Sequence, residues 1–138
     1  MKLFDFSAVK IILLGDSGYR IGWDQWSHQD YGLSYFWVLI ESDWYKAKAK
    51  VETDRESIKT FHDKLTQLSR TQINEVVFWA GAGLYEMTLK LGNRGSISVS
   101  GSLAKSMVDS SRLPYEFESH LPAVDNFSKS IGKLLKTW

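Results

Sequence analysis

Short apolar runs bounded by turn-forming residues make up most of this chain. Some runs are rich in β-branched and aromatic side chains, and others alternate apolar and polar residues, which is typical of strands with one or both faces buried. Seven segments have one of these patterns: 9–14, 33–41, 44–52, 75–80, 84–91, 96–101 and 113–117. Pro114 near the start of the last run predicts that this strand lies at a sheet edge, because proline cannot donate to a ladder.

Two further segments repeat apolar residues at helical intervals. The Thr-x-x-Glu pattern of 53–56 predicts a capping box that opens a helix ending near Arg70. Its apolar stripe consists of Ile58, Phe61, Leu65 and Leu68. A second helix is expected after Pro122, with lysines concentrated toward its C-terminal end, where the helix dipole favours cations.

The predicted order is three strands, a helix, four strands and a helix (βββαββββα). Strands grouped in runs, without regular alternation with helices, favour an antiparallel sheet. We therefore expect a single α+β domain over residues 1–138, with six to seven strands packed against two helices. No internal repeat, linker or low-complexity tract is visible in the residues.

Residues 15–32 have no consistent apolar period and are predicted to form a long aromatic loop. Nine of the nineteen aromatic residues lie between Tyr19 and Tyr45, and those in the loop are surrounded by small and polar residues. We expect Trp23, Trp26 and Tyr31 to stay partly exposed as anchors for a partner. The predicted polar rim consists of Asp24, Gln25, His28 and Asp30.

Composition excludes several classes of function. Seventeen basic and sixteen acidic residues give a net charge of +1, which disfavours nucleic acid as the main partner. The sequence has no cysteine, which fits a reducing cytoplasmic compartment. The apolar run at 9–14 is far too short to span a bilayer, and no export signal precedes it, so no membrane association is expected.

One segment is similar to the Gly-Asp-Ser block of the GDSL or SGNH esterases. Ser17 would be the nucleophile, with Asn93 and His120 following in the family's order. However, Phe117 stands where the family has an aspartate, and the predicted order of elements does not give the parallel sheet of those enzymes. We favour a turn in which Asp16 and Ser17 hydrogen-bond their own backbone.

The other polar clusters predict neither catalysis nor metal binding. Asp24 and Asp30 flank His28 and would form an acid–base cluster only if the loop brought them together; shaping the loop or contacting a partner is the preferred reading. None of the three histidines has the spacing of a metal site, so no metal, cofactor or catalytic residue is assigned. The alternating lysines of 46–50 are expected to face solvent and guard a strand against aggregation.

The order and spacing of the apolar elements match a known family over nearly the whole chain. The matching elements are the strands from Trp37 to Val51, the helix with Asp54, Phe61, Leu65 and Leu68, the hairpin with Leu89, Gly95 and Gly101, the segment Leu113–Phe117, and the helix opening at Leu121 and Pro122. This layout resembles the WapI-like immunity proteins of bacterial polymorphic toxin systems. The resemblance implies a non-enzymatic protein that binds and blocks a cognate toxin domain inside the producing cell.

Together, these observations predict an intracellular binding protein that acts by occlusion. A near-neutral charge disfavours a nuclease toxin as the target, because inhibitors of cationic nucleases are often strongly acidic. Two alternatives remain: a small hydrolase using Ser17, and a domain with an aromatic pocket for a small ligand such as a sugar. A homodimer is also left open.

Overall fold

The chain forms eight β-strands and two α-helices in a computed structural model, which describes residues 6–29, 31–104 and 111–138. The strands are β1 Ile11–Leu14, β2 Arg20–His28, β3 Leu33–Glu41, β4 Lys46–Asp54, β5 Glu75–Ala80, β6 Tyr85–Leu91, β7 Ser96–Ala104 and β8 Arg112–His120. The helices are α1 Arg55–Ser69 and α2 Leu121–Thr137, and three short 3₁₀ helices are η1 Phe6–Ala8, η2 Gly81–Gly83 and η3 Asn93–Gly95.

The strands form two antiparallel four-stranded sheets. One has the order β1-β2-β3-β4 and the other the order β5-β6-β7-β8, so each strand pairs with its neighbour along the chain. The predicted α+β class and the two helices are confirmed, and β8 lies at a sheet edge as Pro114 predicted. The prediction of one sheet with six to seven strands is wrong, because the strands number eight and divide between two sheets.

The additional strand is β2, which occupies half of the predicted loop at 15–32. Its pairing with β3 shifts register between Asp24 and Ser27, and Gln25 there has a φ of 56°. This bulge turns both Trp23 and Trp26 toward the ring of Phe36 inside the molecule, although they are three residues apart. Strict alternation is lost as a result, and with it the signal that would have indicated a strand.

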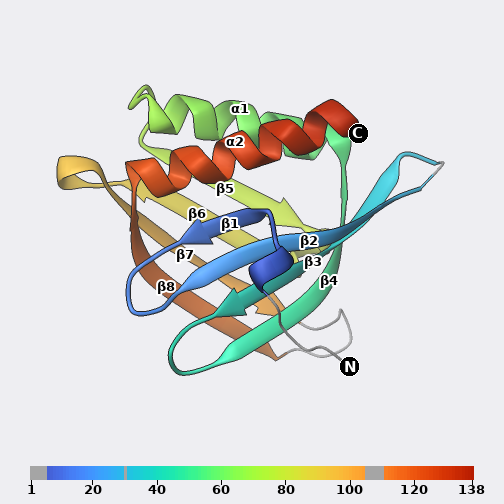
Figure 1. Ribbon diagram of the computed structural model, residues 1–138, viewed down its shortest axis with the longest axis horizontal. Helices are drawn as coiled ribbons and strands as arrows, with labels where there is room; N and C mark the ends of the chain where they lie inside the picture. Colours follow the sequence, from blue (N-terminus) through green and yellow to red (C-terminus); the bar gives the residue numbers. More distant parts are fainter. Residues whose placement is uncertain (1–5, 30, 105–110) are drawn as a thin grey trace.

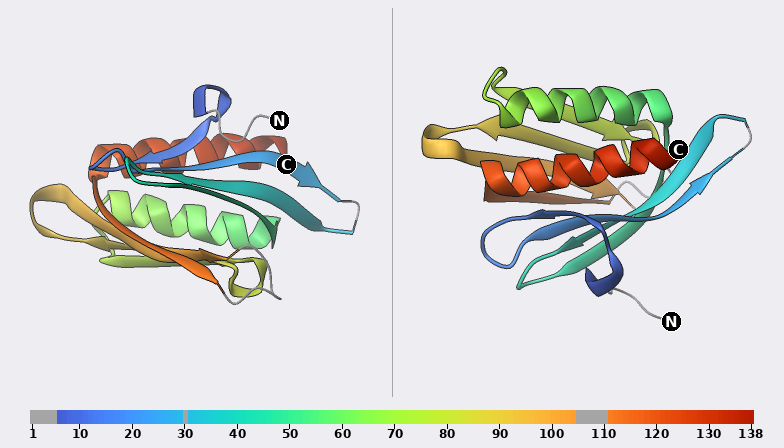
Figure 2. Two further views of the ribbon diagram at one scale, coloured as in Figure 1. Left: turned by 90° about the horizontal axis from the view of Figure 1, so that it is seen from below. Right: turned by 45° about the horizontal axis from the view of Figure 1, so that its top comes forward.

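With β2 included, the order of elements repeats: four strands and a helix occur twice. The two helices lie side by side along one side of the molecule (Figure 1). Each helix contacts the first strand of the other half, α2 beside β1 and α1 beside β5 (Figure 2). This repeat was not visible in the sequence, because the missed strand left the first half one element short.

The core lies between the inner faces of the two sheets and the two helices. One hydrophobic cluster contains side chains from both sheets and both helices. At its centre, the indole N–H of Trp23 donates a 3.0 Å hydrogen bond to the hydroxyl of Tyr85, which links the two sheets. Burial raises the pKa of Tyr85 and of Tyr115 above the usual tyrosine value, so both hydroxyls stay protonated at neutral pH.

Helix α1 begins within the segment 53–56, as the capping-box pattern predicts, but a different residue caps it. The carboxylate of Asp54 accepts a hydrogen bond of 2.7 Å from the backbone N–H of Ser57, whereas the sequence pattern assigned the cap to Thr53. The four apolar residues predicted to face the core are all buried. Within the described ranges, no helix is long and apolar enough to cross a membrane.

Candidate binding surfaces

The residues predicted to bind a partner do not form one exposed face. Trp23 is only 1% exposed and lies in the core, so the expectation that it stays accessible is wrong. The physical reason is its position in β2, where its side chain points inward and meets side chains from the second sheet. A residue at this place stabilises the fold and cannot contact a partner directly.

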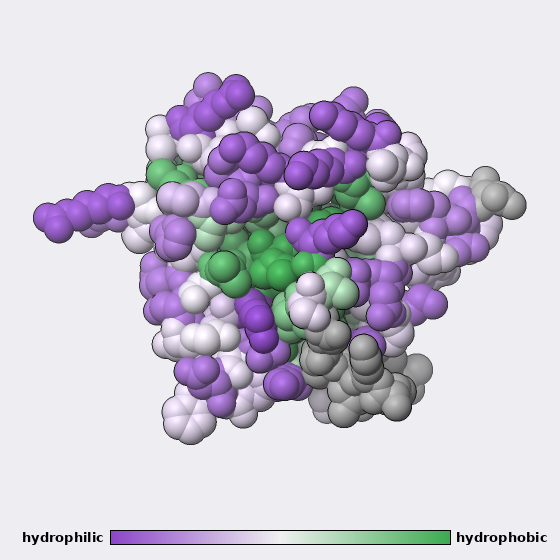
Figure 3. Space-filling view, viewed as in Figure 1, coloured by the Kyte–Doolittle hydropathy of each residue, from purple (hydrophilic) through white to green (hydrophobic). Residues whose placement is uncertain are grey.

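Trp26 is half-buried beneath the C-terminal end of α2. Its ring stacks on Phe36 at a centroid distance of 4.3 Å and lies 5.4 Å from the ring of Trp138. Together with Asp24 and Trp23 it lines a hollow of about 520 Å³ between β1 and α2. Figure 3 faces this side of the molecule and shows hydrophobic surface near β1, bordered by hydrophilic side chains.

Two other predicted site residues, His28 and Tyr31, lie toward the end of the β2–β3 hairpin, which projects beyond the sheet (Figure 1). His28 makes a 2.8 Å hydrogen bond between its Nδ1 and the hydroxyl of Ser34, and its ring centroid is 4.5 Å from that of Trp138. Gln25 is exposed at the bulge, and Asp30 lies outside the described residues. The hydroxyl partner of His28 fits the preferred reading, in which hydrogen bonds of this residue shape the segment.

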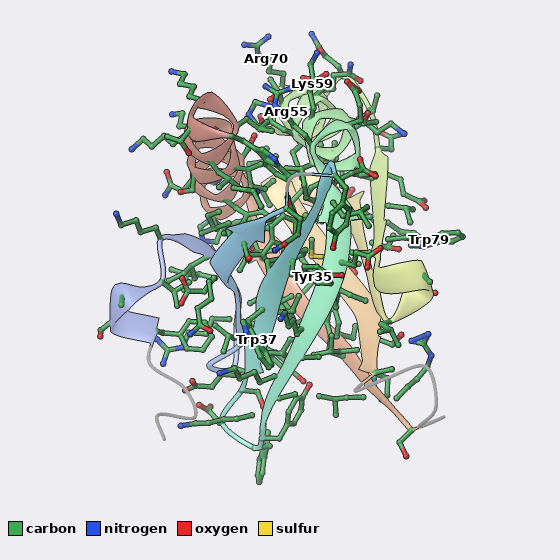
Figure 4. All side chains as sticks on the ribbon, turned by 90° about the vertical axis from the view of Figure 1, so that its right-hand side faces the viewer. Tyr35, Trp37, Arg55, Lys59, Arg70 and Trp79 are labelled. Carbon is green, nitrogen blue, oxygen red and sulfur yellow. The ribbon has the colours of Figure 1, made fainter. Side chains whose placement is uncertain are left out.

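Tyr31 is 66% exposed, as predicted. A hydrogen bond with Tyr31 and, as the next largest cause, a hydrogen bond with Glu52 raise the pKa of Tyr35 to about 12. Tyr35 and Trp37 lie on the outer face of β3 (Figure 4). They alternate along the strand with Phe36 and Val38, which are buried on its inner face.

Lysines of β4 cover these outer rings. The Nζ of Lys48 lies 4.5 Å from the ring centroid of Trp37, and that of Lys50 lies 5.0 Å from the centroid of Tyr35. Such cation–π contacts occupy the ring faces that a partner would otherwise use. The outer face of the first sheet is therefore a weaker candidate for a partner-binding surface than its two aromatic side chains alone would indicate.

The esterase-like block forms the turn between β1 and β2. Its Asp16 carboxylate accepts a hydrogen bond from the backbone N–H of Glu118 at 3.0 Å, and the Asp16 N–H donates to the Glu118 carbonyl at 2.8 Å. The carboxylate thus bonds a strand of the second sheet, not its own backbone as predicted. Ser17 is exposed, with a φ of 53°. This turn joins the two sheets at the β8 edge.

Asn93 and His120, the two other residues of the alternative hydrolase reading, have structural positions of their own. His120 caps α2, where its Nδ1 accepts a hydrogen bond from the backbone, and Asn93 lies in the 3₁₀ turn between β6 and β7. No hydrogen bond joins Ser17, Asn93 and His120 in the part of the chain that the structure describes, where every strand ladder is antiparallel. Across the same ranges, no three acidic or histidine side chains gather as a metal site would require.

Two exposed apolar side chains lie on β5, an edge strand of the second sheet. Val77 is 45% and Trp79 67% exposed, and Figure 4 shows Trp79 pointing away from the ribbon. The alternation in Glu75–Ala80 explains their position, because Val76, Phe78 and Ala80 face the core. The sequence itself carries this alternation, with Val77 and Trp79 on the face opposite to Val76, Phe78 and Ala80.

Polar side chains of α1 flank the two exposed residues. Glu56, Thr60 and Lys64 lie one turn apart and, with Val77 and Trp79, line a hollow of about 300 Å³. Trp79 also borders a second hollow of about 630 Å³ toward the end of β4. We call Val77, Trp79, Glu56, Thr60 and Lys64 the β5 surface.

Comparison with known proteins adds no functional assignment. No protein-family model matches the sequence, and no curated protein matches it significantly. The resemblance to WapI-like immunity proteins therefore stays a prediction from the sequence.

Proposed function

We propose that this chain is an intracellular immunity protein that neutralises a cognate toxin domain by occluding it through the β5 surface. The observation that supports this proposal is the exposure of Trp79 and Val77 on an edge strand. Tryptophan is enriched among the residues that contribute most to protein–protein binding, and edge strands are usually protected by charges or short length. Here the edge carries apolar side chains instead.

The surface has the anatomy of a protein interface. An aromatic residue that is two thirds exposed lies between two hollows, and side chains of α1 with opposite charges, Glu56 and Lys64, border it. A toxin domain that covers Trp79 would bury its ring while the charged side chains remain at the rim. In addition, β5 pairs with β6 alone among the described strands, so an extended toxin segment has an unpaired edge to join.

The test is a binding measurement with the C-terminal toxin domain encoded beside the gene for this chain. Replacing Trp79 by Ala is expected to weaken the complex by at least about 2 kcal/mol, or roughly thirtyfold in Kd. Trp44→Ala is the matched control, because Trp44 is 89% exposed but lies on the β3–β4 turn. Titration calorimetry measures both variants, and thermal unfolding confirms that both are folded.

Protection of cells that express the toxin domain gives a second measurement. Trp79→Ala should lose protection at low expression of the immunity chain, while Trp44→Ala should keep it. If the two variants bind and protect equally well, the β5 surface is not the toxin-binding site. If the unsubstituted chain neither binds nor protects against this toxin, the immunity proposal fails as a whole.

A further inference from the structure

A second candidate site lies away from the β5 surface, in the hollow between β1 and α2. Its volume of about 520 Å³ is within the range of pockets that hold small molecules. Trp23, Trp26 and Ile11 lie along its sheet side, and Leu134 extends from α2 to the other side. These side chains form the apolar part of the lining, and polar and charged side chains form the rest.

The ring of Trp26 forms a fixed wall of the hollow. Stacking on Phe36 at a centroid distance of 4.3 Å holds the ring in place, and the ring of Trp138 lies 5.4 Å away. The Nε1 atom of Trp26 is buried, so the carbon atoms of the ring, and not its N–H, line the hollow.

The charged side chains around the hollow favour an anionic ligand. Lys10, which precedes β1, and Lys133 of α2 both line it, and neither forms an ion pair with any residue that the structure describes. Asp24 is the one acidic residue of the lining, so one positive charge is in excess. The hydroxyls of Ser130 and Thr137 already donate to helix carbonyls and offer only their acceptor lone pairs.

We propose that this hollow binds a small carboxylate with an aromatic or branched apolar body. The apolar body would rest on Trp26, Ile11 and Leu134, and the carboxylate would accept hydrogen bonds from Lys10 and Lys133. Charge-assisted hydrogen bonds of this kind are stronger than neutral ones, so the ligand's charge is expected to contribute to its affinity as much as its shape. This site does not depend on the toxin-binding proposal, since the two surfaces share no residue.

The test is a titration of the full chain with 4-phenylbutyrate, followed by NMR of the six tryptophan indole N–H groups. The resonance that disappears in Trp26→Phe identifies Trp26. This resonance is expected to shift on titration, while that of the exposed Trp44 stays in place. The neutral analogue 4-phenylbutyramide has the same apolar body and is expected to bind about tenfold more weakly.

Two lysine variants on the same helix complete the test. Lys133→Met should weaken binding of 4-phenylbutyrate by about tenfold. Lys136→Met should leave it unchanged, because Lys136 is exposed on α2 but does not line the hollow. The proposal is overturned if the Trp26 resonance does not move at millimolar ligand, if the acid and the amide bind equally, or if the two lysine variants behave alike.

Discussion

Six aromatic rings surround Trp23, with centroid distances of 5.1 to 6.3 Å. Replacing Trp23 by Ala would remove this packing and the hydrogen bond to Tyr85, and would leave a cavity between the sheets. We expect the free energy of unfolding to fall by about 3–5 kcal/mol. Urea denaturation measures the change, and Trp44→Ala should alter stability by less than about 0.5 kcal/mol. Similar losses in both variants would contradict the assignment of Trp23 to the core.

The buried tyrosines predict how stability depends on pH. Burial raises the pKa of Tyr85 and Tyr115 in the folded state, so the unfolded chain loses these protons first, near the ordinary pKa of about 10. Their contribution to stability is therefore complete below pH 10 and decreases as the pH rises further. Urea midpoints measured across this range should fall, and Tyr115→Phe should reduce the slope. A slope that is unchanged in this variant would show that Tyr115 is not responsible.

At the scale of elements, the start of α1 offers a test of which residue caps the helix. Asp54→Ala should lower the free energy of unfolding by about 1 kcal/mol, because the Ser57 N–H loses its acceptor. Asp54→Asn keeps an acceptor oxygen and should retain most of the stability. Chemical denaturation of the three proteins measures the difference. Equal stability of the Ala and Asn variants would mean that the side chain of Asp54 does not cap α1.

The sequence predicts an element well where its own residues carry the pattern. The stripe of Ile58, Phe61, Leu65 and Leu68 is complete within α1, and all four residues are buried as expected. The strand β2 was missed because the bulge at Gln25 makes Trp23 and Trp26 point the same way, so no simple period remains. Local patterns are informative only when no irregular backbone interrupts them.

The division into two sheets could not be predicted from the sequence, for a different reason. It depends on contacts between distant residues, such as the hydrogen bond from Trp23 to Tyr85, which are 62 positions apart. The candidate sites divide in the same way. Trp79 was open to prediction from alternation in β5, whereas the β1–α2 hollow arises only when the end of the chain packs beside its beginning.

On the scale of the whole molecule, charge predicts how the proposed toxin complex forms. The net charge of +1 gives little long-range steering toward either an acidic or a basic partner. The association rate with the toxin domain should therefore change by less than about threefold between low and high salt. Stopped-flow measurements test this expectation. A tenfold or larger decrease on adding salt would instead indicate recognition driven by a local charge cluster.

Because each helix contacts the first strand of the other half, neither half is expected to fold alone. Helix α1 belongs to the first half, residues 1–70, but it contacts β5 of the second half. Helix α2 belongs to the second half, residues 71–138, but it contacts β1 of the first half. Cleavage in the connection between α1 and β5 would give two fragments that each leave apolar surface uncovered when alone. We expect these fragments to be unfolded or aggregated separately and to regain the native structure by complementation when mixed.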